Sequence, residues 1–425
     1  MKRWMKVCAA LSLSVGAVGT FAESYLRDVA DGYRAEEAYQ LHKDWTLTKF
    51  LTVTPEGGYS YLHLAQQLPH ATIYRAGPVV ALGSRPDPEL NQLSVEWQGQ
   101  KSTLNEIVMS DDSPLQGVMV VHRGRVIYEQ YPGMRPFDNH VWMSNAKPIA
   151  SLILGQLEDE GRLDVAQPVV RYLPEAKGTQ WESVRVIDVL NMQSGLDVVE
   201  NAAARANPQS GFSRFMVSEV GYPNTDGEVL THNEALFEAG YLREPGQAFE
   251  YSSANTQLLG LLIESITGQR LADVVSERLW RHMGAEGDAQ LGLSPQGNGI
   301  IHGLVSSRLS DMARFGMLYT PSWKKVSKTP LVSAASLKKI HTAGNADAYY
   351  KGEMGPKMAS LFGERPVSNA YQWDAVFADG DLYKAGMNGQ GVYVSPAKDL
   401  VVVWFANGFS SIPMERVART ISLSK

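Results

Sequence analysis

The chain has 425 residues, with 39 basic and 45 acidic side chains and a formal net charge of −6. Its hydrophobic fraction of 44% and charged fraction of 20% are ordinary for a globular protein and exclude a disordered or fibrous chain. The acidic balance, with no run of Lys and Arg, argues against a nucleic acid partner.

The first 22 residues have the pattern of a bacterial export signal. Three basic residues open an apolar stretch over residues 7–18, and a small-residue cleavage pattern ends at Ala22. The stretch is too short for a stable anchor, so we expect a periplasmic or secreted protein with no integral membrane span; a tethering helix is the alternative. The only cysteine, Cys8, lies in this segment, so the mature chain would have no thiol for disulfides, catalysis or metal binding.

The amino-terminal part predicts turns followed by a hairpin. Pro and Gly residues at 55–58 and 84–88 favour turns over a separate domain. Residues 117–122 and 126–129 predict a β-hairpin around a short Arg-Gly-Arg turn. Its first arm is almost wholly apolar, which is typical of a central strand covered on both faces.

The rest of the chain predicts helices and then strands. Apolar side chains recur at helical spacing over 148–160 and 256–266, and a glycine follows each segment. Residues 391–394 and 400–406 predict two strands, and 412–423 a closing helix. Strands at both ends with helices between them indicate one sheet built from the two chain ends, with a helical lobe inserted.

One S-x-x-K motif stands out by its context. The sequence contains no G-x-S-x-G elbow, H-E-x-x-H helix, Walker loop or dinucleotide fingerprint. Ser144 and Lys147 precede the predicted helix 148–160, where positions i and i+3 share a face and the helix dipole favours a developing anion. The alternative is a plain serine cap with a solvated lysine. The same spacing recurs, without such a helix, at Ser322/Lys325, Ser336/Lys339, Ser395/Lys398 and Ser422/Lys425.

A tyrosine lies before the second predicted helix. The Tyr251 hydroxyl could relay a proton from a serine to a lysine, provided that burial and positive neighbours lower its pKa from about 10. The alternative is a buried aromatic ring whose hydroxyl is simply hydrogen-bonded. For His140 and His302 we expect solvated or capped side chains.

Together these motifs resemble the serine β-lactamase-like hydrolases, in the branch of class C β-lactamases, family VIII carboxylesterases and 6-aminohexanoate-dimer hydrolases. The resemblance covers roughly residues 105–410 and implies an α/β fold, with an antiparallel sheet from both chain ends and an inserted, mainly helical lobe. The implied domains are 23–143 plus 300–425 for the sheet and 144–299 for the lobe. The matching motifs are Ser144-Asn145-Ala146-Lys147-Pro148, 159–163, 188–196, Pro245-Gly246, 251–260, 310–316 and Gly389-Gln390-Gly391.

The resemblance also implies roles for individual residues. Ser144 would be the nucleophile, Lys147 its proton acceptor, and Tyr251 a general base and acid. Ser253 stands where many members carry Asn in a Y-x-N motif, and resembles the Y-x-S variant of the aminohexanoate-type enzymes. We therefore expect Ser253 to make a polar contact in the site.

The family's third motif, a cation-x-Gly on an edge strand, has two registers in this sequence. We favour Met387-Asn388-Gly389 over Lys384-Ala385-Gly386, because the turn and the following strand then match better. In that register the amides of Ser144 and Gln390 would form the oxyanion hole, next to Asn388 and Gly389. The cation that holds a substrate carboxylate would be missing.

We expect an exported serine hydrolase that needs neither metal nor cofactor and forms an acyl-serine intermediate on a small-molecule ester or amide. A carboxylesterase or a 6-aminohexanoate-dimer-hydrolase-like amidase fits best. One alternative is a β-lactamase or D,D-peptidase acting on peptidoglycan-like substrates. Another is a non-catalytic envelope protein in which the family's active-site pocket serves only for binding.

Overall fold

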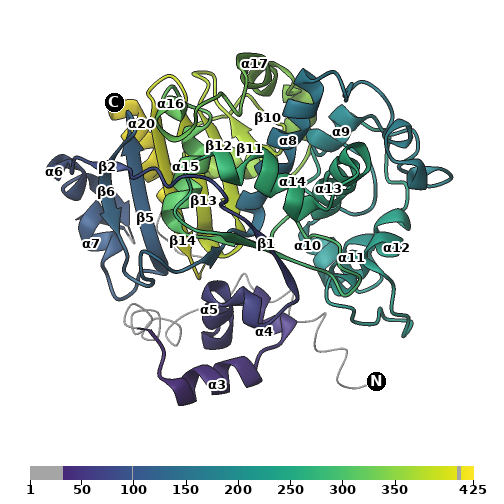
Figure 1. Ribbon diagram of the computed structural model, residues 1–425, viewed down its shortest axis with the longest axis horizontal. Coiled ribbons are helices and arrows are strands. Elements are labelled where there is room, and N and C mark those ends of the chain that lie inside the picture. The colour runs from purple at the N-terminus through teal and green to yellow at the C-terminus, as the bar shows by residue number, and fades with distance from the viewer. Residues whose placement is uncertain (1–31, 98, 409–412) are drawn as a thin grey trace.

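The computed structural model describes residues 32–97, 99–408 and 413–425. The predicted export signal lies outside these residues and stays a prediction. The main sheet has eight strands in the order β10-β11-β12-β13-β14-β5-β6-β2 (Figure 1). Their bounds are β2 Gly83–Ser84, β5 Leu115–His122, β6 Arg125–Gln130, β10 Ser368–Ala370, β11 Trp373–Val376, β12 Leu382–Gly386, β13 Gln390–Ser395 and β14 Leu400–Ala406.

The two chain ends meet in the middle of this sheet, where β14 pairs antiparallel with β5. The predicted hairpin is confirmed, since β5 pairs antiparallel with β6. The two predicted carboxyl-terminal strands are confirmed as β13 and β14, which also pair antiparallel. The expected architecture, one sheet built from both ends with helices between them in the sequence, is therefore confirmed.

Both faces of the sheet are covered because its central strands carry apolar side chains on both faces. Along β5, Met119 and Val121 join one hydrophobic cluster, whereas Val118 and Val120 join another. Successive side chains point to opposite faces, so the sheet separates these clusters. Helix α15 (Leu309–Met317) contributes to the first cluster and α20 (Met414–Ser424) to the second. Helix α20 confirms the predicted closing helix.

The region between β7 and β8 is mainly helical. Helix α8 (Lys147–Asp159) and helix α13 (Ser253–Thr267) confirm the two predicted helices, and Gly268 ends α13 with a φ of +70°. Around them lie α9 Val186–Leu190, α10 Ala202–Ala206, α11 Gly211–Ser218, α12 His232–Phe237, α14 Leu271–Arg278, and the short 3-10 helices η4 Val169–Arg171, η5 Pro174–Ala176 and η6 Trp280–His282.

A second sheet, which the sequence did not predict, runs in the order β1-β8-β9-β7. Its strands are β1 His70–Ile73, β7 His140–Val141, β8 Ala289–Gly292 and β9 Val305–Ser307. Strand β7 lies just before Ser144 and β9 follows His302, so this sheet brings the two segments together. A separate hairpin consists of β3 Ser94–Trp97 and β4 Gln100–Thr103.

The amino-terminal segment folds as helices, drawn in purple in Figure 1. The prediction of a turn at 55–58 is wrong, because these residues begin α5 (Pro55–Leu62). Thr54 caps that helix, accepting a hydrogen bond from the Gly57 amide at 3.0 Å, and proline is well tolerated in a first turn. The neighbouring helices are α3 Ala35–Lys43, α4 Leu47–Leu51 and the 3-10 helix η2 Leu64–Gln66.

The other described helices lie at the edges of the main sheet or after α15: α6 Pro88–Asn91, α7 Leu104–Val108, α16 Trp323–Val326, α17 Ala334–Thr342, α18 Ala346–Lys351 and α19 Met354–Phe362. The predicted turn at 84–88 is wrong, because residues 85–87 continue from β2 as extended chain, with the Arg85 and Asp87 amides bonded to β6, up to α6, which Asp87 caps. Within the part of the chain that the structure describes, no helix combines the length and the apolar character needed to cross a membrane.

Candidate active site

Ser144 lies at the mouth of α8. It belongs to the 3-10 turn η3 (Met143–Ala146), which runs directly into that helix. The residue before it, Met143, has a φ of +48°, a conformation that residues with a side chain adopt at a cost and that is often found at functional sites. Ser144 is partly exposed and lines a pocket, whereas Lys147, one turn further on, is fully buried.

The Lys147 ammonium is held by two oxygen acceptors. Its Nζ donates to Ser253 Oγ at 2.9 Å and to the His302 backbone oxygen at 2.7 Å. Burial lowers the pKa of Lys147 to about 7, a shift that the Glu200 carboxylate opposes and the Lys384 charge reinforces. A sizeable fraction of Lys147 is therefore neutral near pH 7 and able to accept a proton. The expected polar contact of Ser253 is this hydrogen bond.

Tyr251 lies beside Ser144 and two lysines. Its hydroxyl shares a hydrogen bond with the Ser144 side chain and accepts one from Lys384 Nζ at 3.0 Å. Lys147 Nζ lies 5.4 Å from the centre of the Tyr251 ring. Burial raises the pKa of Tyr251 well above 10, and the charges of nearby carboxylates add to the rise, so the expectation of a lowered pKa is wrong. Tyr251 is a neutral phenol at neutral pH, suited to passing a proton rather than to being the resting base.

Lys384 settles the register of the third motif. It lies on β12, is fully buried, and forms a 2.6 Å ion pair with Asp374, which also accepts the Ala385 amide at 2.9 Å. Because Lys384 contacts the Tyr251 hydroxyl, Lys384-Ala385-Gly386 is the cation-x-Gly motif beside the site. The register that the sequence favoured is wrong, and the cation is present.

The glycine of this motif is required by close packing. A Cβ on Gly386 would lie 2.8 Å from Asn145 Nδ2 and 3.0 Å from the Trp142 backbone oxygen, so strand β12 passes directly against the Ser144 turn. The next residue, Met387, lines the pocket together with Ser144.

The residues expected around the oxyanion hole lie just beyond that point, in the turn from β12 to β13. Of Asn388, Gly389 and Gln390, none is among the described residues that line the pocket. Their polar groups support the turn: Asn388 Nδ2 donates to the Tyr61 hydroxyl, the Gly389 oxygen accepts from Trp404 Nε1, and Gln390 Nε2 donates to the Met387 oxygen. The structure thus brings Ser144, Lys147, Tyr251 and Ser253 together. Asn388, Gly389 and Gln390 lie outside the pocket lining.

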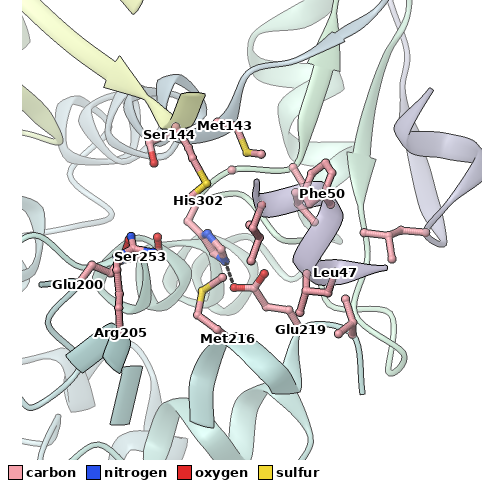
Figure 2. Close-up of a pocket in the computed structure, with 16 residues that line it drawn as sticks. Leu47, Phe50, Met143, Ser144, Glu200, Arg205, Met216, Glu219, Ser253 and His302 are labelled. Carbon is pink, nitrogen blue, oxygen red and sulfur yellow. Dashed lines mark hydrogen bonds and ion pairs between the residues drawn. The ribbon is translucent and has the colours of Figure 1, made fainter. Parts of the chain in front are cut away.

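The pocket beside Ser144 has one apolar side and one polar side. Leu47 and Phe50 of α4 face the pocket across from Ser144 (Figure 2), so the amino-terminal helices form part of its wall. The other apolar lining residues are Leu51, Leu68, Met143, Met216, Val220, Leu304 and Met387. The polar ones, besides Ser144, are Glu200, Arg205, Glu219, Ser253 and His302.

Glu200 is a buried carboxylate that lines the pocket and contacts Ser253. Its Oε1 accepts the Ser253 amide at 2.5 Å, and its Oε2 lies 3.0 Å from Arg205. Burial opposes ionisation of Glu200, but Arg205, Lys147 and the Ser253 hydrogen bonds bring its pKa below the usual value. Glu200 is therefore ionised, and it is bound to the only cation among the described residues that line the pocket.

The two histidines singled out in the sequence are both buried, so of the expected states, solvated or capped, the solvated one is wrong. His140 Nε2 lies 2.6 Å from Gln116 Oε1, and its Nδ1 lies 2.8 Å from the Val141 oxygen, which is a structural role. His302 instead faces the pocket, with Nε2 3.0 Å from Glu219 Oε1. Glu219, His232 and His302 form a buried group whose atoms could hold a metal ion.

Comparisons with known proteins place the chain in a family. The family model described as Beta-lactamase matches residues 112–424. The chain is 28% identical over 352 residues to the 6-aminohexanoate-dimer hydrolase of Paenarthrobacter ureafaciens, covering 82% of this chain and 85% of that protein.

Two solved structures illustrate the likeness of fold. One is a Bacillus anthracis protein assigned to the 6-aminohexanoate-dimer hydrolases, with a TM-score of 0.71, 24% identity, and coverage of 87% of this chain and 93% of that one. The other is EstCE1, a hydrolase with promiscuous acyltransferase activity, with a TM-score of 0.54, 16% identity, and coverage of 72% and 94%. Both likenesses concern the β-lactamase-like α/β fold alone.

Proposed function

Because the chain belongs to the beta-lactamase family of serine hydrolases, we propose that it cleaves ester or amide bonds of neutral small molecules through an acyl intermediate on Ser144. The observation that carries this proposal is the Lys147 side chain. It is buried one turn from Ser144, its pKa is about 7, and it is fixed by Ser253 and the His302 oxygen. A lysine in that state is a proton acceptor at neutral pH.

The reaction then proceeds in two balanced halves. Ser144 Oγ bonds to the substrate carbonyl carbon while its proton passes through Tyr251 to Lys147. The amides of Ser144 and Met387 stabilise the oxyanion, because β12 ends against the Ser144 turn. The carbon–oxygen or carbon–nitrogen bond breaks, and the proton returns through Tyr251 to the leaving group. Water then attacks the acyl-serine by the same path and releases the acid.

The charges around the pocket favour a neutral substrate. Arg205 is bound to Glu200 and Lys384 to Asp374, so each of these two cations is already paired with a carboxylate. A substrate carboxylate would also meet the ionised carboxylate of Glu200, which lines the pocket. Bringing a like charge there without a partner costs several kcal/mol.

A covalent probe and a substrate panel test this proposal. We expect a fluorophosphonate to modify Ser144, as located by peptide mass spectrometry. We expect kcat/KM for p-nitrophenyl butyrate to exceed that for benzylpenicillin by about a hundredfold or more, because of the charge argument above. An unmodified Ser144 together with no ester turnover would support the non-catalytic binding protein instead.

One observation favours a second candidate, a β-lactamase or D,D-peptidase. Lys384-Ala385-Gly386 occupies the cation-x-Gly position next to Tyr251, which the sequence had left without a cation. If benzylpenicillin is hydrolysed faster than the neutral ester, this second candidate replaces the first, and the Lys384–Asp374 pair does not prevent carboxylate binding.

The amino-terminal wall predicts a change in acyl specificity. Phe50→Leu removes part of a ring that is 2% exposed and lines the pocket. The larger space is expected to raise the ratio of kcat/KM for p-nitrophenyl hexanoate over the acetate by about tenfold, the scale of one methylene in an apolar pocket. Tyr39→Leu, on the same segment but 74% exposed, is the control and should leave the ratio unchanged. An unchanged ratio in Phe50→Leu would place acyl binding elsewhere.

A further inference from the structure

We propose that Glu219, His232 and His302 form a binding site for one divalent transition-metal ion, such as Zn²⁺, in the wall of the pocket. Each residue offers one ligand atom, and these atoms all lie within 4.8 Å of one another. Around a tetrahedral zinc ion, ligand atoms lie roughly 3.3 Å apart, as follows from bonds of about 2.0 Å. Small side-chain rotations would therefore suffice to close the site.

Three unpartnered atoms converge there. Glu219 Oε1, His232 Nε2 and His302 Nε2 are buried, and none has a hydrogen-bond partner among the residues that the structure describes. Glu219 Oε1 and His302 Nε2 lie 3.0 Å apart, a contact marked by a dashed line in Figure 2, but they do not meet the geometry of a hydrogen bond. A buried polar atom without a partner costs about 1–3 kcal/mol. A single metal ion would satisfy all three atoms together.

The donor set suits zinc. Two imidazole nitrogens and one carboxylate oxygen are a common ligand set for catalytic Zn²⁺. The other ring nitrogen of His232, Nδ1, lies 3.0 Å from Ser218 Oγ, which leaves Nε2 directed to the site. A partner of this kind on the second nitrogen is typical of metal-bound histidine.

The three proposed ligand residues come from separate parts of the fold, so their spacing in the sequence matches no metal-binding motif. Glu219 directly follows α11, His232 begins α12, and His302 lies between β8 and β9. This is why the sequence predicted no metal. Glu219 and His302 line the pocket and His232 lies behind them, so an ion held here can be reached from the pocket.

The site is adjacent to the proposed catalytic group but separate from it. Lys147 Nζ donates to the backbone oxygen of His302. The ion, bound to the His302 side chain, and the proposed proton acceptor would therefore contact the same residue. No step of the acyl-serine reaction runs through the ion. The metal proposal therefore stands or falls independently of the proposed function.

Zinc binding to the full chain tests the proposal. The chelator-treated protein is titrated with Zn²⁺ by calorimetry, and Co²⁺ is added separately to record its visible absorption bands. We expect one Zn²⁺ per chain, and a Kd raised about a hundredfold or more in Glu219→Gln and in His232→Gln. His282→Gln and Glu277→Gln are matched controls on exposed side chains and should bind as the wild type does.

A measurement on the wild type alone guards against variants that fail to fold. Zn²⁺ is expected to raise Tm by about 2 °C or more over the chelated protein, because an ion that binds only the folded state stabilises it. Fluorophosphonate labelling of Ser144 should persist after chelation, which separates loss of the ion from loss of the active site. The absence of stoichiometric binding and of a Tm rise in the wild type would overturn the proposal. Equal affinity in folded Glu219→Gln would do the same.

Discussion

Ser144→Ala is expected to lower kcat for p-nitrophenyl butyrate by about 10,000-fold or more, the scale seen when a serine hydrolase loses its nucleophile. The substitution removes a single oxygen from a partly exposed side chain, so the fold and Tm should be retained. Steady-state kinetics, circular dichroism and fluorophosphonate labelling of the same preparation measure the three effects together.

Two serines provide matched controls for that result. Ser151 lies on the same helix α8, is buried, and donates only to the Pro148 backbone oxygen at 3.1 Å. Ser336 belongs to a look-alike S-x-x-K motif whose hydroxyl contacts Ser333 and Asp159. Ser151→Ala and Ser336→Ala should keep near-wild-type turnover. If Ser144→Ala retains wild-type activity, the acyl-serine mechanism is wrong.

The elements that the sequence predicted correctly are those set by local patterns. The apolar arm of β5 and the apolar stripes of α8 and α13 each follow a short-range period. Such a period requires no knowledge of what packs against the element. The position of Ser144 at a helix mouth follows from the same local pattern.

The register of the third motif could not be obtained in this way, because it depends on pairing between strands. Lys384 and Met387 both precede a glycine by two positions, and the sequence favoured Met387 on the likeness of its turn. In the structure Gly386 pairs with Gln390 across β12 and β13, which ends β12 at the Ser144 turn and leaves Lys384 two residues inside the strand. Only the strand pairing shows that Lys384 is the residue that reaches Tyr251.

Burial explains the other errors. His302 and His140 were expected to be solvated or capped, but both are buried, because the small sheet β1-β8-β9-β7 and the amino-terminal helices cover this region. The pKa of Tyr251 was expected to fall, yet burial raises it. The sequence did not identify Asp374 and Glu219 as site residues. Each is placed there by a contact with a residue outside its own local segment, Lys384 for Asp374 and His302 for Glu219.

The structure thus assigns different work to the two groups beside Ser144. Burial destabilises a charged lysine and a charged phenolate alike, so it moves the pKa of Lys147 down to about 7 and that of Tyr251 up. In the proposed mechanism Lys147 is therefore the base, and Tyr251 passes the serine proton to it. Because Tyr251 and Lys147 would belong to the same proton-transfer path, we expect them to act as a unit.

Lys147→Met and Tyr251→Phe are therefore each expected to lower the rate of acylation by about a hundredfold or more, the scale of general acid–base catalysis. Both changes nearly conserve side-chain volume, so the packing around Ser253 should survive. The double variant is expected to lose about as much as the worse single variant, and not the product of the two losses, because either change already breaks the proton path. Single-turnover kinetics with p-nitrophenyl butyrate measures this step directly.

Control variants of the same residue types lie outside the proton path. Tyr350→Phe removes a partly buried hydroxyl that donates to the Pro366 oxygen, and Lys339→Met breaks a half-exposed pair with Glu158. Both should acylate at the wild-type rate. Multiplicative losses in the double variant would mean that Lys147 and Tyr251 act on separate protons. A wild-type rate in Tyr251→Phe is a different contrary outcome, which would leave Lys147 as the sole base, taking the Ser144 proton without a relay.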